Sequence, residues 1–424
     1  MKSVITCDKE GIIKTLSTGA VRLFGYDKEE LIDKKRVSIF SPGEIVLQNV
    51  ATWLKTAEDE GKYETETIFE RKNGEKINAW IKITPLYGDG KDKPLTGYCG
   101  ITKPIEKEVD VPIKFTTKLV KFLAITRMPF LSAVLMPALA GGAFVSAYMA
   151  QGSAAFEFNT LYFILTLVGL MLLHLGSNVM NDYFDVKDGT DDANNNYFMQ
   201  YSGGSRAVEL RLITLEGTQK LGLGLILASF VVGVYLAFNV GWMALLIGLT
   251  GLFLGYYYTA PPLRLVARKG LGELAITLAF GPLITLGMGF VLTQQLSAET
   301  FLLGLPLGLL TANILLINQF PDAEADATTG KNHLVVTYGK EASTWIYLAI
   351  LTGALISSMF IWNMLMPDNY AFLSVSIASY AAGLAIWRKI RQDYRSRRLV
   401  KQNVNTIMLS ALTGLAMAGA IWLG

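Results

Sequence analysis

Amide and acidic side chains recur at helical spacing in the segment NVMNDYFDVKDGTD, residues 178–191. If the segment is a helix, Asn178, Asp182 and Asp185 share one face. The apolar run LYFILTLVGLMLLHLGS precedes it, and ionised groups beside hydrocarbon are costly unless cations neutralise them. A hard divalent metal with an anionic ligand would neutralise this cluster. A second row on the helix and the end of the segment add Asn181, Asp188 and Asp191.

A matching cluster, NQFPDAEAD, ends another apolar run and places Asn318, Asp322 and Asp326 at successive helical turns. Each cluster alone is equally consistent with a solvated acidic helix end, but two copies that both begin with asparagine favour a shared site. Mg²⁺ prefers oxygen ligands, keeps several waters and takes its remaining ligands from substrate phosphates. The two clusters together therefore predict a site in which metal ions hold a diphosphate and stabilise its departure.

The composition indicates that these clusters lie in a membrane protein. The 424-residue chain has a mean hydropathy of +0.37 and 51% hydrophobic residues, although its N-terminal quarter is polar. A helix crosses a bilayer with about 20 residues. The polar N-terminus MKSVITCDKEG predicts that no cleavable signal peptide is present. Nine stretches are apolar enough to span: 129–150, 160–180, 219–238, 241–259, 271–293, 300–320, 343–365, 370–387 and 404–423.

The basic residues predict the orientation of these helices. Beyond residue 129, Lys and Arg fall only in or beside the loops after the second, fourth, sixth and eighth stretches. By the positive-inside rule those loops are cytoplasmic, together with both acidic clusters and the N-terminal region. We therefore expect a multi-pass protein of the cell (inner) membrane, with its N-terminus and the mouth of the site in the cytoplasm. The opposite loops, which carry no Lys or Arg, are 151–159, 239–240, 294–299 and 366–369.

The charge pattern argues against a nucleic-acid-binding protein, and the positions of the cysteines argue against a disulfide. The net charge of +3 reflects this topology, and no long basic surface with interleaved aromatic residues indicates nucleic-acid binding. Cys7 and Cys99 belong to the cytoplasmic part, where a disulfide is not expected.

The N-terminal region alternates strand-like runs with turn signals in the order β-β-α-β-β-β. That order, with the phrases GAVRLFGYDKEELI, FERKNGEK and LYGDGKDKPLTGYCGITK, resembles a PAS domain over residues 1–104. The resemblance implies a sensor or dimerisation module, whose ligand is unknown and which need not have one. The region contains no histidine, which argues against haem with an axial histidine. Residues 105–128 are predicted to form a linker and an interfacial helix.

Residues 129–424 resemble the UbiA superfamily of intramembrane prenyltransferases. The resemblance rests on nine helices with NDYFDVKDGTD after the second, YYTAPPLRL after the fourth and NQFPDAEAD after the sixth. It implies an all-α polytopic membrane bundle of nine transmembrane helices, preceded by the α+β PAS-like domain. The implied catalytic and Mg²⁺-binding residues are Asp182, Asp185, Asp322 and Asp326, with Asp188 and Asp191 as further metal ligands and Asn178, Asn181 and Asn318 as substrate-binding residues.

Five further residues are candidates for substrate binding. The Gly203-Gly204 pair suggests a loop over the cytoplasmic mouth, from which Arg206 would offer its guanidinium to the diphosphate, and Lys331 would act similarly. The alternative interpretation is that both residues are surface charges that only determine the membrane topology. Tyr257, Tyr258 and Arg264 match positions at which the family places contacts to the aromatic acceptor, although tyrosines are also common at membrane interfaces.

The resemblance implies transfer of a polyprenyl group from an allylic polyprenyl diphosphate to an aromatic acceptor. NDYFDVKDGTD, SGGSR, YTAPPLR and GKNHLVVTYGK look most like the menaquinone branch, whose acceptor is 1,4-dihydroxy-2-naphthoate. Other acceptors are 4-hydroxybenzoate, homogentisate and a glycerol ether lipid. A non-catalytic membrane receptor coupled to the PAS-like domain would not need two acidic metal sites. A transporter would carry its charges near the bilayer midplane and not at the helix ends.

Overall fold

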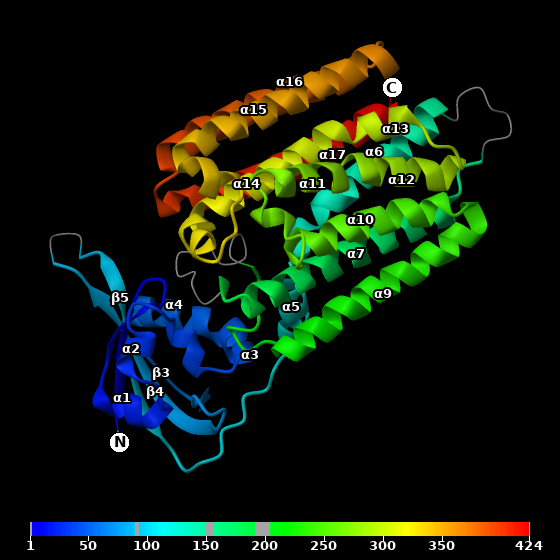
Figure 1. Cartoon of the computed structure of the whole chain (residues 1–424). Coiled ribbons are helices and arrows are strands. Elements are labelled where there is room, and N and C mark those ends of the chain that lie inside the picture. Colours follow the sequence, from blue (N-terminus) through cyan, green and yellow to red (C-terminus); the bar gives the residue numbers. More distant parts are fainter. Residues whose placement is uncertain (1, 90–92, 150–156, 191–203, 424) are drawn as a thin grey trace. The chain divides into compact units, whose positions relative to one another are not determined.

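The computed structural model describes residues 2–89, 93–149, 157–190 and 204–423 (Figure 1). The chain divides into two compact units, which interleave along the sequence. The first unit contains Met1–Ile125 together with Arg206–Thr214. The second contains Thr126–Ser205 and Leu215–Gly424. A short segment between two helices of the second unit therefore packs with the N-terminal region of the chain.

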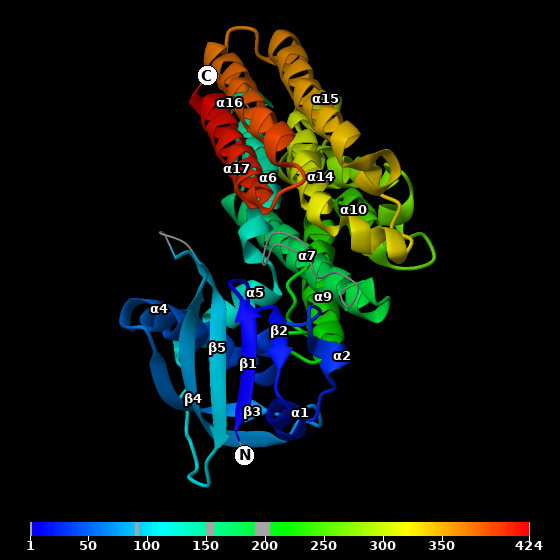
Figure 2. The same cartoon turned by 90° about the vertical axis from the view of Figure 1, so that its left-hand side faces the viewer.

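The first unit is built on a five-stranded antiparallel sheet in the order β2-β1-β5-β4-β3 (Figure 2). The five strands coincide with the strand-like runs in the sequence, and the predicted α+β PAS-like fold is confirmed. The strands are β1 (Ser3–Asp8), β2 (Ile13–Leu16), β3 (Tyr63–Glu70), β4 (Lys76–Tyr87) and β5 (Leu95–Pro104), and the helices are α1 (Thr18–Phe24), α2 (Lys28–Leu31), α3 (Gly43–Ile45), α4 (Ala51–Glu60) and α5 (Phe115–Ile125), with the short turns Val37–Phe40 and Val46–Val50.

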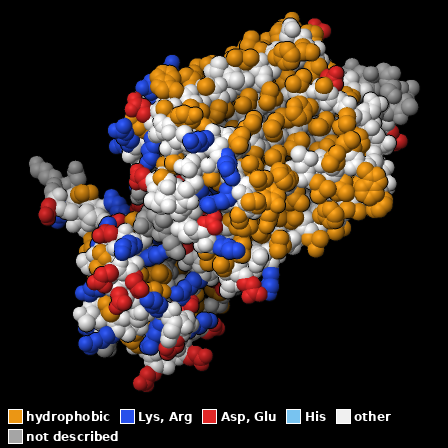
Figure 3. Space-filling model, viewed as in Figure 1, with side chains coloured by type: hydrophobic (Ala, Val, Ile, Leu, Met, Phe, Trp, Pro, Cys, Tyr) orange, Lys and Arg blue, Asp and Glu red, His pale blue; other side chains and the backbone are white. Residues whose placement is uncertain are grey.

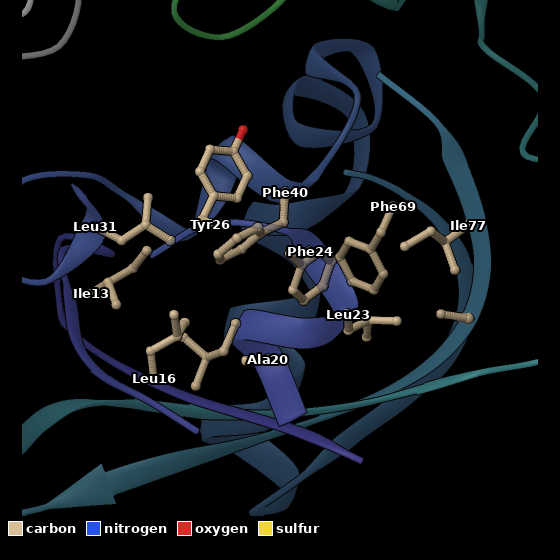
Figure 4. Packing of buried hydrophobic residues seen from close by; sticks show 12 residues of the cluster. Ile13, Leu16, Ala20, Leu23, Phe24, Tyr26, Leu31, Phe40, Phe69 and Ile77 are labelled. Carbon is tan, nitrogen blue, oxygen red and sulfur yellow. The ribbon is translucent and has the colours of Figure 1, made fainter. Parts of the chain in front are cut away.

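Aromatic side chains fill the core between the sheet and the helices that follow β2 (Figure 4). Phe24 stacks on Phe40, with ring centroids 4.2 Å apart, and meets Phe69 edge-on at 5.8 Å. Aromatic pairs at these distances stabilise a core beyond the burial of their area. The phrase GAVRLFGYDKEELI thus supplies the core residues Phe24, Tyr26 and Leu31.

The segment Arg206–Thr214 is held in the first unit by polar and apolar contacts. Arg211 pairs with Glu70 on β3 at 2.5 Å and donates to the hydroxyl of Tyr26 at 3.0 Å. Leu210 and Leu212 are buried, and both approach Gly43 so closely that a Cβ there would lie 2.1 Å from the Leu210 carbonyl oxygen. The segment is therefore an integral part of the packing of this unit.

The second unit is entirely helical within the described residues (Figure 1). Its main pairs of packed helices are α7 with α9, α14 with α15, and α17 with both α6 and α16. The helices are α6 (Ser132–Phe144), α7 (Thr160–Lys187), α9 (Leu215–Val240), α10 (Met243–Thr259), α11 (Leu271–Ala279), α12 (Pro282–Thr293), α13 (Ala298–Leu303), α14 (Leu305–Thr328), α15 (Leu334–Leu365), α16 (Tyr370–Asp393) and α17 (Val400–Leu423), with single turns at Met128–Leu131, Val145–Met149, Leu265–Ala267 and Arg397–Leu399.

The helical unit has the dimensions and surface of a membrane domain. Among the described residues, eight helical segments are long and apolar enough to span, and α10 is a shorter apolar helix. These segments correspond to the nine predicted stretches, so the predicted membrane bundle is confirmed. Figure 3 shows hydrophobic side chains covering one face of this unit. Such a continuous apolar surface is stable in lipid, which explains why Phe238 and Leu227 are 72% and 62% exposed.

Candidate active site

Helix α7 carries the first acidic cluster on its last turns. The Asn159 side chain caps the start of the helix by accepting from the Tyr162 amide at 3.0 Å. The helix continues through the apolar run to Lys187, so Asn178, Asp182 and Asp185 lie on one face as the spacing predicts. Asp188 is the C-terminal cap, whereas Asp191 lies outside the described residues.

Helix α14 carries the second cluster and is longer than the predicted stretch. It continues through Pro321 to Thr328, so Asn318, Asp322 and Asp326 lie within the helix and not beyond its end. After the helix the chain turns back, and the Lys331 amide donates to the Asp326 carbonyl oxygen at 2.9 Å. This turn places the Lys331 side chain beside the helix that it follows.

Lys331 connects the two acidic clusters. Its ammonium lies 2.7 Å from Asp185 Oδ1 on α7 and 3.8 Å from Asp326 Oδ1 on α14. Asp326 also contacts His333, with Nε2 at 3.1 Å from Oδ2. The Lys331 side chain is only 7% exposed, so one buried cation balances carboxylates from two helices that are far apart in the sequence. Ion pairs therefore join the two clusters, which the sequence predicts to share one site.

Asp182 lies on the same face of α7 in a different environment. Its Oδ2 accepts from the Ser205 amide at 3.1 Å, and the Arg127 guanidinium lies 3.9 Å from Oδ1. Within the described part of the chain, Oδ1 is buried and has no hydrogen-bond donor. A buried carboxylate oxygen that accepts no hydrogen bond leaves a position at which a cation can bind.

Polar partners fix the three asparagines. The Asn178 amide lies 3.2 Å from His174 Nε2, one turn earlier on α7. Asn181 accepts from the Thr259 hydroxyl at the end of α10. Asn318 accepts from Asn403 on α17 at 2.8 Å. Side chains from α7, α10 and α17 therefore orient the three amides of the acidic clusters.

A cavity of about 280 Å³ extends from these amides into the helical unit. Asn178, Asn181 and Asn318 line it together with Arg127 and Tyr258, and the remaining lining is mostly apolar. The apolar walls come from α6, α7, α9, α10, α11, α12 and α14 and from the turn Met128–Leu131. A pocket that is polar at one place and apolar elsewhere suits a ligand with a charged head and a hydrocarbon tail.

The predicted acceptor-contact residues have different surroundings. Tyr258 lines the cavity, whereas Tyr257 is not among the lining residues and packs with Met180, Phe184 and Ala260. Arg264 pairs with Asp188 at 3.0 Å, so its guanidinium connects the loop after α10 to the end of α7. The structure thus places Tyr258 at the cavity and gives Arg264 a carboxylate partner.

Arg206 belongs to the segment that packs in the first unit. Its side chain is 1% exposed and pairs with Glu209 at 3.3 Å. Its backbone is left-handed, with φ of 56°. Gly203, the first glycine of the predicted loop, lies outside the described residues.

The oxygen atoms of the site fit a hard divalent cation that also binds phosphate. No three Asp, Glu, His or Cys side chains form a ready-made cage within the described ranges. Mg²⁺ does not require one, because it keeps waters and is bound through one or two carboxylates plus substrate phosphates. Asp182 Oδ1, which accepts no hydrogen bond within the described residues, and the carboxylates near Lys331 are suitable ligands for such an ion.

Sequence reasoning did not select several residues that organise the site. Arg127 precedes the first apolar stretch and is not part of either motif, yet it lies beside Asp182. Asn403 and His333 contact Asn318 and Asp326 from other helices or turns. Of these three residues, only His333 lies close in the sequence to a predicted site residue, because it is two residues after Lys331.

Comparisons with known proteins identify both parts of the chain. Residues 134–412 match the profile of the UbiA prenyltransferase family, and residues 2–101 match that of the PAS domain. The 1,4-dihydroxy-2-naphthoate octaprenyltransferase of Bacillus subtilis is 27% identical over 57% of this chain and 78% of its own length. A UbiA prenyltransferase domain-containing protein 1 homolog of Drosophila melanogaster is 32% identical over 58% of this chain and 66% of its own length.

The fold also matches solved structures. A UbiA homolog from Archaeoglobus fulgidus, bound to DMAPP and Mg²⁺, superposes with a TM-score of 0.53 at 16% sequence identity. The match covers 71% of this chain and 99% of that structure. At this identity the similarity establishes the fold of the helical unit.

Proposed function

The chain belongs to the UbiA prenyltransferase family, and from this premise we propose that it transfers a polyprenyl group from an allylic polyprenyl diphosphate to 1,4-dihydroxy-2-naphthoate in menaquinone biosynthesis. The observation that carries the proposal is the Lys331 bridge between Asp185 and Asp326, together with a mostly apolar cavity that is lined by asparagines of the same two motifs. The curated name of the similar Bacillus subtilis protein supports this acceptor.

The residues of the two clusters would bind the diphosphate head through Mg²⁺. Asp182, Asp185, Asp322 and Asp326 are the proposed cation ligands, and when bound, Mg²⁺ neutralises the charge that develops on the leaving diphosphate. Lys331 would then turn its ammonium from the carboxylates to the phosphate oxygens, since it already lies between both motifs.

The cavity would hold the reacting carbon and the acceptor away from water. Departure of diphosphate leaves an allylic cation, which water would capture if it entered. The apolar walls exclude water, while Asn178, Asn181 and Tyr258 present polar atoms at the end near the clusters. The acceptor ring would attack the prenyl carbon, and its carboxylate would leave as carbon dioxide.

A panel of acceptors tests this proposal. Protein in lipid vesicles would be incubated with Mg²⁺, a polyprenyl diphosphate and one of three acids: 1,4-dihydroxy-2-naphthoate, 4-hydroxybenzoate or homogentisate. We expect a prenylated product by mass spectrometry with the naphthoate and none or little with the other two. A glycerol ether lipid would be tested as a fourth acceptor. A product with only one of the other acceptors would assign the enzyme to a different branch of the family.

The charge distribution supports a cytoplasmic orientation. Beyond residue 129, the basic residues lie in or beside the loops that join α7 to α9, α10 to α11, α14 to α15 and α16 to α17. We therefore infer that the acidic clusters and the N-terminal domain face the cytoplasm of a cell (inner) membrane. The basic and apolar helix α5, with Phe115 80% exposed, would lie at the lipid interface.

We also propose that the PAS domain modulates the reaction through the segment Arg206–Thr214. This segment is anchored in the first unit by Arg211 with Glu70 and Tyr26, and by the buried Leu210 and Leu212. Ser205, the residue before it, donates its amide to the site carboxylate Asp182. A rearrangement of the PAS domain would therefore act on Asp182 through a few residues of continuous backbone.

A charge-exchange experiment tests this regulation. Exchange of Glu70 for Gln, or of Arg211 for Gln, should change the rate of prenyl transfer several-fold, which is the usual scale of coupling between sites. The double variant Glu70→Arg with Arg211→Glu should restore the rate toward that of the native protein. The matched control is Glu75→Gln, which breaks an exposed pair with Arg71 on the same unit. Unchanged rates in both single variants would contradict the proposed coupling.

A further inference from the structure

His333 lies in the turn between α14 and α15 and is completely buried. Its Nδ1 accepts from the Val336 amide at 3.3 Å, which makes it the N-terminal cap of α15. Its Nε2 lies 3.1 Å from Asp326 Oδ2. One side chain therefore joins the start of a long helix to a carboxylate of the proposed site.

The two contacts determine which nitrogen carries the proton. A nitrogen that accepts from a backbone amide must have a free lone pair, so Nδ1 is unprotonated. In the neutral ring the proton is then on Nε2, and Nε2 donates to Asp326. This donation occupies Oδ2 and leaves Oδ1 as the oxygen that faces Lys331, at 3.8 Å.

The backbone around His333 holds the imidazole in place. The Lys269 amide donates to the Asn332 carbonyl oxygen at 2.9 Å, and the Leu334 amide donates to Glu273 Oε1 at 3.1 Å. Glu273 is itself buried and accepts from Gln319 on α14 at 3.0 Å. The turn is thus fixed from α11 and α14, and the ring has little freedom to leave Asp326.

We propose that His333 is a positioning residue that orients Asp326, so that one carboxylate oxygen is held by Nε2 and the other is presented to the cation and diphosphate. The inference rests on the proposed function of Asp326 as a cation ligand. Residues that hydrogen-bond to metal-binding side chains commonly change metal affinity 10–100-fold when they are replaced. His333 would act through Asp326 and would not touch the substrate.

Two variants separate this role from helix capping. In His333→Asn the side-chain oxygen can occupy the place of Nδ1 and retain the cap, but nothing reaches Asp326. In His333→Gln the longer side chain can place its amide nitrogen near the place of Nε2 and donate to Asp326, while the cap is impaired. Ser297→Ala is a matched control, because it removes the cap of α13, where Ser297 accepts from Thr300 at 3.1 Å.

The probe is Mn²⁺, titrated with inorganic diphosphate and followed by electron paramagnetic resonance on the full chain. We expect His333→Asn to bind the Mn²⁺–diphosphate at least tenfold more weakly than the native protein. His333→Gln and Ser297→Ala should melt at lower temperatures but bind it nearly as the native protein does. Native affinity in His333→Asn, or equal weakening in all three variants, would overturn the role of His333. Absence of binding to the native protein would instead refute the proposed cation site.

Discussion

Exchange of Asp185 or Asp326 for asparagine should lower the rate of prenyl transfer at least a hundredfold while the protein remains inserted and folded. Each exchange keeps the size of the side chain but removes an anionic ligand, and the loss of one preorganised electrostatic group commonly costs about 10²–10³ in rate. The two residues come from α7 and α14, yet both lie within reach of the same ammonium of Lys331. Their losses should therefore be similar, and the double variant should be little worse than either single one.

The control for these variants lies on the same helix. Glu324 is between Asp322 and Asp326 on α14, but its side chain is 74% exposed. Glu324→Gln removes one negative charge from this region and should leave the rate nearly unchanged. Asp322→Asn and Asp182→Asn are expected to behave like the Asp185 and Asp326 variants. Substantial turnover in the Asp322→Asn, Asp326→Asn double variant would contradict a mechanism that uses both clusters.

Replacement of Lys331 by methionine should have the second large effect. The variant leaves Asp185 and Asp326 buried without their shared cation, and breaking a buried ion pair by removing one partner costs about 3–5 kcal/mol. The melting temperature without metal should therefore fall. Added Mg²⁺ should recover much of this loss, because a divalent ion can take the place of the ammonium between the carboxylates.

The kinetic consequence distinguishes binding from folding. If Lys331 donates to the diphosphate, the KM for the polyprenyl diphosphate should rise by more than tenfold, and the KM for the aromatic acceptor should change little. Lys340→Met is the matched control, since Lys340 pairs at 3.2 Å with the exposed Glu324 near the same turn. Equal changes of both KM values in Lys331→Met would mean that Lys331 stabilises the fold without binding the diphosphate.

Local patterns predicted the elements that carry the site. The strand-like runs became the five strands of the sheet, and the apolar stretches became the helices of the second unit, because both signals depend on side-chain periodicity within one element. The spacing of Asn178, Asp182 and Asp185 likewise predicted a shared helix face. The helices extend further than hydropathy predicted, since α7 and α14 continue through their polar last turns to Lys187 and Thr328.

Contacts between elements that are far apart in the sequence could not be predicted from such patterns. The sequence offered no signal that Arg264 would pair with Asp188, that Asn403 would hold Asn318, or that Arg211 would join the PAS-containing unit. Each of these contacts depends on how helices and loops pack in three dimensions. Tyr257 and Tyr258 are a smaller example: adjacent residues on a helix point in different directions, and only Tyr258 lines the cavity.

The most direct test of the central claim is the stoichiometry of the reaction in a membrane. Full-length protein in lipid nanodiscs would receive Mg²⁺, a polyprenyl diphosphate and 1,4-dihydroxy-2-naphthoate, and the released diphosphate and the prenylated product would be measured together. The account predicts equal amounts of both, and neither of them after chelation of the metal or in Asp326→Asn. Binding of the polyprenyl diphosphate without its cleavage, as expected of a receptor, or diphosphate release without a prenylated product, would contradict it.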